Sequence, residues 1–325
     1  MVKTALITGI SGQDGAYLAQ WLLAQGYHVW GSSRDAEVSS FRNLEQLGIR
    51  QQVKTLSISL NDFRSVLQGI RQSNPEEIYN LAGQSSVGLS FEQPVETLES
   101  VAIGTLNLLE SIRFLNPGIR LYQAASSECF GNTKQPANEQ TPFYPRSPYA
   151  VAKATSFWTV ANYREAYGLY ACSGILFNHD SPLRPERFVT QKIVATACRI
   201  AQGSRETLVL GNMDIRRDWG WAPEYVIAMY RMLQQDKPED YVVATGASYS
   251  LQAFVETAFQ CVGLNWQDHV VQDPRLFRPS DIAVSLGDPS LAQRQLGWQA
   301  QSLMPDVVRL MVTAQQHSPT PNKPL

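Results

Sequence analysis

The sequence predicts an α/β protein in which a doubly wound parallel sheet is followed by a smaller, mixed lobe. Two observations support this fold class. Apolar stretches of strand length alternate with helical patterns through the first half of the chain, which is typical of a parallel sheet with helices on both faces. This alternation then weakens, so we expect the sheet domain over 1–177 and the smaller lobe over 178–316, with some return to the sheet. A disordered tail is expected over 317–325, which is rich in proline and polar residues.

The composition excludes several classes of protein. The chain has 325 residues, enough for a large α/β domain and a second lobe. Its 27 basic and 29 acidic residues give a net charge of -2, so we expect neither nucleic acid nor a membrane surface as a partner. No signal peptide precedes the first strand pattern, and no apolar run is long enough to cross a membrane. We therefore expect a soluble protein.

The cysteines indicate neither a zinc site nor a disulfide framework. Cys129, Cys172, Cys198 and Cys261 are far apart, and their spacing matches neither pattern. A reducing, cytoplasmic environment is the simplest explanation. Cys129 stands beside Glu128 and could therefore be a catalytic nucleophile. A cysteine of this kind is more often a buried thiol that only packs in the core.

The first expected strand, over 4–8, runs into a glycine turn and then into a helical pattern that ends at Gly26. The spacing of Gly9, Gly12 and Gly15 would let backbone amides approach a pyrophosphate at the amino end of the helix, where the dipole favours anions. Any tight turn between a strand and a helix can use glycine, so the motif indicates a dinucleotide site only because of its position between the two.

The second expected strand, over 27–31, lacks the terminal acidic residue that would bind a ribose hydroxyl of NAD. Arg34 follows three residues later and suits the 2′-phosphate of NADP. We therefore predict NADP as the cofactor. The alternative is that Arg34 is a solvated loop residue whose charge is reduced by the neighbouring Asp35.

Further strand and helix units follow. Strands are expected over 53–58 and 77–82, and helices over 62–72 and 101–114. These units would extend the same parallel sheet. The loop 83–86 follows the fourth strand and should line the cofactor, although serine-rich loops are also ordinary turns.

The candidate catalytic residues follow the next apolar strand. Ser126 should emerge at the carboxyl end of that strand, where open α/β sheets hold their ligands. Further along, Ser147 suits a helix N-cap and Pro148 suits the first helical position. A helix that begins there places Tyr149 and Lys153 on one face, because they are four residues apart.

These residue types suit proton transfer. An ammonium near a phenol favours the phenolate, so Lys153 should lower the pKa of Tyr149 and let it take a proton from a substrate alcohol. Ser126 can donate a hydrogen bond to the same oxygen, and Glu128 would be a second base for a different atom. An isolated Tyr-x-x-x-Lys match more often marks an amphipathic helix with a snorkelling lysine, so the assignment depends on the cofactor turn.

The second half of the chain concentrates residues that bind anions. Short strands over 207–210 and 241–244 alternate with helices, as expected of a lobe above the carboxyl edge of the sheet. Two or three cations together would hold a second pyrophosphate, that of a nucleotide sugar, although each alone is more typical of a surface charge. These cations are Arg184, Lys192, Arg216, Arg217 and Arg278.

Three other residues of this half could suggest a metal site or a base-stacking platform, and we expect neither. His179 stands where a strand meets a loop, and neither histidine nor cysteine lies nearby in the sequence, so we predict no metal site. Trp219 and Trp221 are expected in the core rather than as platforms for stacking bases.

The chain resembles the extended short-chain dehydrogenases, which have a Rossmann-type fold, and within them it is similar to the GDP-mannose 4,6-dehydratase family over nearly its whole length. Four segments carry the resemblance, and the last three together are the specific ones: 8–15, 141–149, 174–179 and 217–220. The resemblance implies a redox-neutral dehydration with tightly held NADP and a GDP-sugar as substrate. We also expect a homodimer.

The implied reaction uses the residues described above. Tyr149, assisted by Lys153 and with Ser126 holding the oxygen, would deprotonate the sugar 4-hydroxyl while a hydride leaves carbon 4 for NADP. Glu128 would then remove the proton on carbon 5 and help to expel the 6-hydroxyl as water, before the hydride returns to carbon 6. The product would be GDP-4-keto-6-deoxy-mannose.

The resemblance also implies which residues contact the two ligands. Besides Arg34, the cofactor would contact Gly9, Ile10, Ser11, Gly12, Gln13, Asp14, Gly15, Ser59, Leu60, Leu81, Ala82, Gly83, Gln84, Ser85, Tyr149, Lys153, His179 and Arg184. The GDP-sugar would contact Ser86, Asn178, Val189, Lys192, Arg217 and Arg278. The chain departs from the family pattern at Ser59, Ser86, Ser126, Pro185, Gln191 and Ala283, and it lacks the paired arginines of the family over 33–36.

Two kinds of alternative function stay open at this point. The first is another nucleotide-sugar enzyme of this fold: a dehydratase of a different GDP-sugar, a 4-epimerase or a 4-keto reductase. Epimerases and reductases need Tyr149 and Lys153 but no acid at position 128, so Glu128 favours dehydration. The second is a non-catalytic, NADP-binding regulatory protein, against which the intact set of Ser126, Tyr149 and Lys153 argues.

Overall fold

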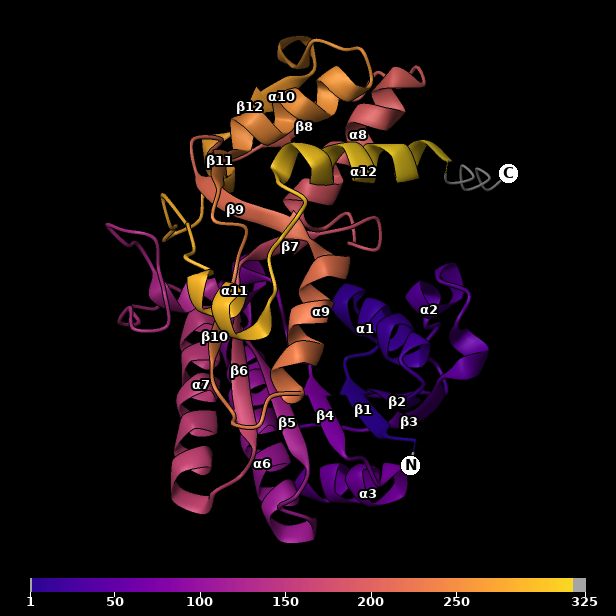
Figure 1. Ribbon diagram of the computed structural model, residues 1–325. Coiled ribbons are helices and arrows are strands. Elements are labelled where there is room, and N and C mark those ends of the chain that lie inside the picture. Colours follow the sequence, from indigo (N-terminus) through magenta and orange to yellow (C-terminus); the bar gives the residue numbers. More distant parts are fainter. Residues whose placement is uncertain (1, 318–325) are drawn as a thin grey trace.

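The computed structural model describes residues 2–317 and has a central sheet of seven parallel strands (Figure 1). The strand order is β3-β2-β1-β4-β5-β6-β10, so the chain builds outward from β1 to one edge and from β4 to the other. The predicted α/β fold with a doubly wound parallel sheet is confirmed. The strands are β1 (Thr4–Thr8), β2 (His28–Ser33), β3 (Lys54–Ser57), β4 (Glu77–Asn80), β5 (Arg120–Ser126), β6 (Ala171–Leu176) and β10 (Tyr241–Val243).

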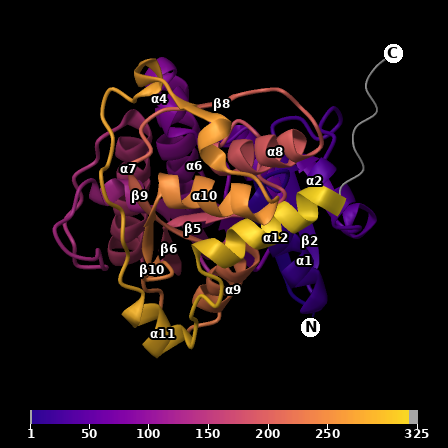
Figure 2. The ribbon, with the colours of Figure 1, turned by 90° about the horizontal axis from the view of Figure 1, so that it is seen from above.

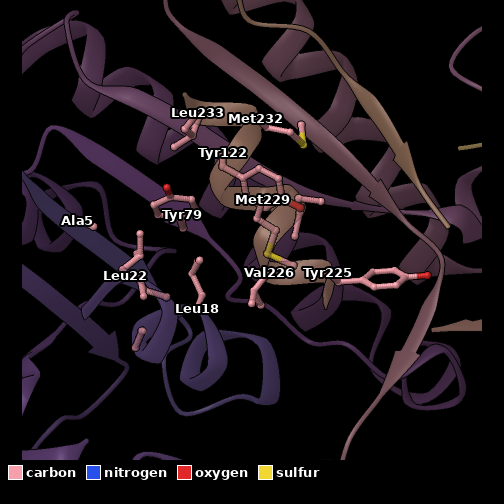
Figure 3. Packing of buried hydrophobic residues seen from close by; sticks show 14 of the residues in the cluster. Ala5, Leu18, Leu22, Tyr79, Tyr122, Tyr225, Val226, Met229, Met232 and Leu233 are labelled. Atoms are coloured by element: carbon pink, nitrogen blue, oxygen red, sulfur yellow. The ribbon is translucent and has the colours of Figure 1, made fainter. Parts of the chain in front are cut away.

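Helices cover both faces of this sheet. Helices α1 and α9 pack together on one face, and α3, α6 and α7 form a row on the other. Figure 3 shows Leu18 and Leu22 of α1 close to Met229 of α9, next to the buried rings of Tyr79 and Tyr122 from the sheet. Burial of these apolar side chains is the main force that holds the layers together. The bounds are α1 (Gln13–Ala24), α3 (Phe63–Ser73), α6 (Gly104–Leu115), α7 (Pro148–Tyr167) and α9 (Ala222–Leu233).

A smaller lobe stands over the carboxyl edge of the sheet (Figures 1 and 2). Its helices α8, α10 and α12 enclose a separate apolar core that contains Trp219, only 2% exposed. Trp219 is therefore a core residue, as predicted, and the partly buried Trp221 packs against the same core. The lobe contains α8 (Val189–Ala201), α10 (Leu251–Cys261), α12 (Met304–His317), β7 (Asn178–Asp180), β8 (Leu208–Leu210), β9 (Arg216–Trp221), β11 (Ser248–Ser250) and β12 (Val270–Gln272).

Two segments differ from their sequence predictions. The strand expected over 241–244 in the smaller lobe is β10, which pairs with β6 as the edge strand of the main sheet. A short, fully buried apolar stretch has no periodicity that would tell which sheet it joins. The helix expected over 101–114 begins earlier, because a π-helical stretch, Glu99–Ile103, leads directly into α6.

The remaining elements are short and lie in connections. They are α2 (Arg42–Gln46), α4 (Val87–Glu92), α5 (Pro94–Leu98) and α11 (Ser290–Leu296), with single helical turns at Arg50–Gln52, Ser127–Phe130, Trp266–Asp268 and Pro274–Leu276. Of the tail predicted over 317–325, His317 is instead the last residue of α12, and 318–325 lie outside the described residues. Within residues 2–317, no helix combines the length and the apolar character needed to span a membrane.

Candidate active site

The candidate residues gather where β1, β4 and β5 end, beside the point at which the strand order reverses between β1 and β4. Gly9 follows β1, Leu81 follows β4, and Ser126 is the last residue of β5. Helix α7 packs along β5 and β6 and brings Tyr149 to the same edge. The smaller lobe covers this edge through β7 and β9 (Figure 1).

The glycine turn after β1 has the shape of an anion-binding cradle. Gly9 has a φ of +74°, and a side chain there would lie 2.9 Å from the backbone of Ala82. A side chain at Gly15 would come within 2.6 Å of the carbonyl oxygen of Gly9, so α1 can pack on the turn only with a glycine there. Gly12 is the N-cap of α1 and offers no capping side chain, which leaves the first N–H groups of the helix to another acceptor. These features fit the diphosphate of a dinucleotide.

The carboxyl end of β2 presents polar groups where an adenine ribose would lie. The Oγ of Ser33 is buried and has no hydrogen-bond partner among the described residues. Arg34 is exposed, and its nearest carboxylate is that of Glu96, at 3.4 Å. The neighbouring Asp35 accepts a hydrogen bond from the N–H of Glu37, so its carboxylate stabilises its own loop rather than pairing with Arg34. Arg34 thus pairs with Glu96 across the surface rather than with Asp35.

The other residues expected near the cofactor lie in two loops at the same edge of the sheet. In the loop after β4, the side-chain amide of Gln84 donates to the carbonyl of Ser86, and Ser86 caps α4. Gly83 in this loop has a φ of +126°, which favours glycine. In the loop after β3, Leu60 is buried and Ser59 is half-buried. Each loop is thus ordered by contacts within the protein.

Helix α7 begins where the sequence predicts. The Oγ of Ser147 accepts a hydrogen bond from the helix backbone at 3.1 Å, and this cap fixes the first turn. Tyr149 and Lys153 are buried, one turn apart. The Nζ of Lys153 donates to the carbonyl oxygen of Ala124 at 2.7 Å and lies 5.8 Å from the ring centre of Tyr149.

The expected lowering of the Tyr149 pKa is not found. Burial raises the pKa of Tyr149, and the hydrogen bond with Ser126 offsets only part of this effect. Lys153 does not act on the phenol as expected, because its ammonium is directed at Ala124 and burial lowers its own pKa to about 8. A phenolate at this position therefore requires positive charge in addition to that of Lys153.

Glu128 lies in the helical turn after β5. Its N–H donates to the Oγ of Ser126 at 3.3 Å, whereas its carboxylate has no hydrogen-bond or ion-pair partner within residues 2–317. Burial raises the pKa of Glu128, and the charges of Arg217 and Arg278 oppose the shift. An unpartnered carboxylate with a raised pKa suits a general base. The adjacent Cys129 is a packed thiol, as predicted, with its pKa raised by burial to about 12.

Arg217 and Arg278 converge on a residue that the sequence analysis missed. The Asp281 carboxylate lies 2.8 Å from Nη2 of Arg217 and 3.6 Å from Nη1 of Arg278. Arg217 is buried, and its Nη1 also donates to the carbonyl of Ile282 at 2.6 Å. Arg278 is more exposed and is therefore the freer of the two to meet an anion. The spacing of three residues between Arg278 and Asp281 is the sequence signal that would have indicated this pair.

The other cations of the second half do not join this pair. Lys192 donates to a backbone carbonyl of β8 at 2.7 Å, Arg184 lies beside a carboxylate of β7, and Arg216 is exposed. Asn178 and Val189, also expected at the substrate, begin β7 and α8 and are half-buried. Within the described chain, no group of three His, Cys, Asp or Glu residues could hold a metal ion.

His179 joins the smaller lobe to the cofactor turn, a contact that no sequence pattern indicated. Its Nε2 lies 2.9 Å from the carboxylate of Asp14, and its Nδ1 lies 2.7 Å from the carbonyl oxygen of Phe177. Gln13 adds two hydrogen bonds, one donated to the carbonyl of His179 at 3.2 Å and one accepted from the hydroxyl of Ser181 at 2.8 Å. The first turn of α1 is thereby tied to β7 and the residue that follows it.

Comparisons with known proteins point to one family. The family profile described as GDP-mannose 4,6 dehydratase matches residues 6–311. The chain is 47% identical over 320 residues to GDP-mannose 4,6 dehydratase 1 of Arabidopsis thaliana. This match covers 95% of this chain and 89% of the relative. The chain is 43% identical over 358 residues to the GDP-mannose 4,6-dehydratase of Vibrio cholerae, covering 98% and 96% of the two chains.

Solved structures share the fold over nearly the whole chain. UDP-glucose 4-epimerase of Thermus thermophilus, complexed with NAD, has a TM-score of 0.84 at 25% identity and covers 97% of this chain and 99% of its own. RMD from Pseudomonas aeruginosa, complexed with NADPH, has a TM-score of 0.80 at 22% identity and covers 97% of this chain and 99% of its own. Proteins of this fold thus hold nicotinamide dinucleotides both with and without the 2′-phosphate.

Proposed function

Since the chain belongs to the GDP-mannose 4,6-dehydratase family, we infer that it is an enzyme that converts GDP-mannose to GDP-4-keto-6-deoxy-mannose and water. The observation that carries the inference is the unpartnered carboxylate of Glu128, held next to Ser126 and in the electrostatic field of Tyr149. A 4-epimerase or a 4-keto reductase has no use for this base, because neither reaction eliminates water. The enzyme is a lyase.

We propose the following roles for the residues of the site. Tyr149 takes the proton of the sugar 4-hydroxyl, and Ser126 holds the same oxygen by a hydrogen bond. A nicotinamide cofactor held at this edge of the sheet would supply reversible hydride transfer between carbon 4 and carbon 6, so the reaction would consume no reductant. The ketone at carbon 4 acidifies carbon 5, and Glu128 removes that proton and delivers it to the departing 6-hydroxyl, which leaves as water. Reduction at carbon 6 also requires a proton at carbon 5, and the proton that Tyr149 took from the 4-hydroxyl balances it, so the enzyme returns to its starting state. Lys153 contributes positive charge at the base of the site.

We propose NADP as the cofactor rather than NAD. The buried Oγ of Ser33 lacks a partner among the described residues, and the exposed Arg34 follows it directly, so phosphate oxygens would satisfy Ser33 and compete with Glu96 for Arg34. The glycine turn would hold the diphosphate. The remaining predicted contacts are with the loops over 59–60 and 81–85, with Tyr149 and Lys153, and with His179 and Arg184.

We propose that the GDP-sugar lies between this edge of the sheet and the smaller lobe. Arg278 would meet its diphosphate first, because Arg217 is already held by Asp281 and by backbone carbonyls. The other predicted contacts are Ser86, Asn178, Val189 and Lys192. Residues 1–177 would then form the cofactor domain and 178–316 mainly the substrate lobe, from which α9 and β10 return to the first domain.

We also propose a cytoplasmic location. The four cysteines are free thiols, and three of them are buried. Unpaired cysteines in a chain of this size fit a reducing compartment. Recovery of the protein from an oxidising, extracellular fraction would argue against this location.

The function is tested by incubating the purified protein with GDP-mannose and a catalytic amount of NADP or, in parallel, of NAD. We expect a product lighter by one water, formed without added reductant and faster with NADP at limiting cofactor. Unchanged substrate with both cofactors would overturn the dehydratase assignment. An equal or greater rate with NAD would overturn the choice of cofactor alone.

We propose that the protein is a homodimer joined through α6 and α7. Val151 and Trp158 of α7 are exposed and, together with the half-buried Leu106 of α6, line an open groove of about 640 Å³. Exposed apolar surface of this extent marks interaction sites in soluble proteins. A second copy related by a twofold axis would cover the face with an identical one, which is the commonest arrangement of oligomers.

The dimer is tested by placing a charge on this face. Val151→Glu should convert the dimer to a monomer and halve the mass measured by light scattering, because a carboxylate would be buried without a partner. Val151 is 43% exposed, and the matched control is Val271→Glu, at a valine of the smaller lobe that is 53% exposed. A monomeric unmodified protein, or a Val151→Glu variant of unchanged mass, would contradict the proposal.

A further inference from the structure

The ring of His179 is enclosed by groups that accept hydrogen bonds. It is 8% exposed and stacks on the ring of Tyr225, with the ring centres 4.4 Å apart. Its Nδ1 faces the carbonyl oxygen of Phe177 at 2.7 Å, and its Nε2 faces the carboxylate of Asp14 at 2.9 Å. A neutral imidazole has one N–H, so it can donate to only one of these acceptors. While Asp14 is ionised, both contacts are hydrogen bonds only when the ring is an imidazolium.

The charged groups around the ring favour that form. Asp14 faces it from α1, Arg184 from the loop after β7, and the Tyr225 ring from α9. Burial works against a charge on the ring and Arg184 adds to this effect, but Asp14 and the carbonyl of Phe177 together outweigh them, so the pKa of His179 is raised. Although burial would raise the pKa of Asp14, the interaction with His179 lowers it to about 2. The Asp14 carboxylate is therefore ionised at any working pH. The pair is neutral when His179 is protonated and carries one negative charge when His179 is not.

This pair lies at the amino end of the helix that the cofactor is proposed to approach. Asp14 belongs to the first turn of α1, whose N–H groups face the glycine turn. A carboxylate without a counter-ion in that turn would compete with a diphosphate for the positive end of the helix dipole. Paired with an imidazolium, it adds no net charge. Gln13 holds the same turn against β7 through the carbonyl of His179 and through Ser181.

We propose that, beyond the contact with the cofactor that is predicted for it, His179 acts through Asp14: as an imidazolium it neutralises the first turn of α1 and ties it to the smaller lobe, and the cofactor binds more weakly once that proton is lost. This rests on the proposed function only in requiring an NADP-type cofactor. It also links the two ligand sites, because Asn178, expected at the substrate, is the neighbour of His179 in β7.

The sign of the pH dependence follows from the raised pKa of His179. The favourable ion pair is complete below that pKa and is lost as the pH rises through it, so cofactor affinity falls toward alkaline pH. The 2′-phosphate of the cofactor, with a pKa of about 6 like other phosphate monoesters, is fully ionised above neutrality and does not contribute to this trend.

The first test is the dissociation constant of NADP, titrated from about pH 7 to about pH 9.5 at constant ionic strength. For the unmodified protein we expect it to rise about tenfold, equivalent to about 1.4 kcal/mol. In His179→Gln and Asp14→Asn this rise should be lost, and in the control His28→Gln, at an exposed histidine, it should be kept. Burial also lowers the pKa of Lys153 to about 8, and the charge of Asp14 acts on this pKa, so the comparison that excludes Lys153 is that of the unmodified protein with His179→Gln, which keeps both residues.

The second test uses the unmodified protein, so its result does not depend on whether a variant without the ion pair can fold. In ¹⁵N-histidine NMR spectra of the unmodified protein at about pH 7.5, one histidine should have both ring nitrogens protonated. A neutral ring for every histidine would overturn the proposal, as would a flat affinity profile or an unchanged rise in His179→Gln. Absence of NADP binding at every pH would overturn the proposed function as well, whereas binding with a flat profile would overturn this inference alone.

Discussion

Replacement of Tyr149 with phenylalanine is expected to lower the turnover of GDP-mannose by a factor of about 10²–10⁴, the usual range for loss of a general acid or base. The ring stays in its buried position at the start of α7, but no group remains to take the proton of the 4-hydroxyl. Both the oxidation at carbon 4 and the loss of water should disappear, since the second step depends on the ketone formed in the first. Stopped-flow absorbance of the reduced nicotinamide and product mass measure the two steps.

The matched control for this variant is Tyr167→Phe. Tyr167 is the last residue of the same helix and is exposed, so the same substitution there should leave turnover unchanged. NADP should still bind Tyr149→Phe, which loses only one hydroxyl at the cofactor site, and this binding would separate a chemical defect from a folding defect. Unimpaired turnover in Tyr149→Phe would remove this tyrosine from the mechanism.

Glu128→Gln is expected to separate the two steps of the reaction. Glutamine has nearly the same shape as glutamate but cannot take the proton from carbon 5, so elimination should slow by about 10²–10⁴. Oxidation at carbon 4 does not need this carboxylate. In a single turnover the absorbance of the reduced nicotinamide should therefore rise and persist, while no product lighter by one water is formed.

Glu165→Gln makes the same change on the exposed surface of α7 and should behave like the unmodified enzyme. A fully active Glu128→Gln variant would contradict the dehydratase mechanism, since no other described carboxylate holds this position after β5. If Glu128→Gln also abolished the transient absorbance, the assignment of Glu128 to the second step would be wrong.

The parts of the fold and the site that the sequence predicts are those governed by local signals. The serine cap at Ser147, followed by a proline, fixes the start of α7 and hence the positions of Tyr149 and Lys153. The glycine turn is recognisable because the contacts that require glycine are made between residues close in the chain. Gly15, for example, packs directly on the backbone of Gly9 and has no room for a side chain. Cys129 was assigned to the core because buried thiols are common.

The features that escaped prediction depend on residues far apart in the chain. Asp14 and His179 are separated by 165 positions, and neither belongs to a periodic pattern that would link them. The direction of the Lys153 ammonium depends on where the carbonyl of Ala124 lies in β5, and the rise in the Tyr149 pKa comes from burial of the phenol. Such effects arise from tertiary packing and desolvation, which single-sequence patterns do not encode.

The late position of β10 in the chain has a consequence for synthesis on the ribosome. When β6 has emerged, its outer edge still has no neighbour, because Tyr241–Val243 follow only after α8, β9 and α9. An open strand edge of a nascent chain can pair with a strand of another chain, and a bound chaperone would prevent this. The sheet of the amino-terminal domain therefore cannot be completed during translation until β7, α8, β8 and β9 of the second lobe have been made, and the two parts are expected to mature together rather than one after the other.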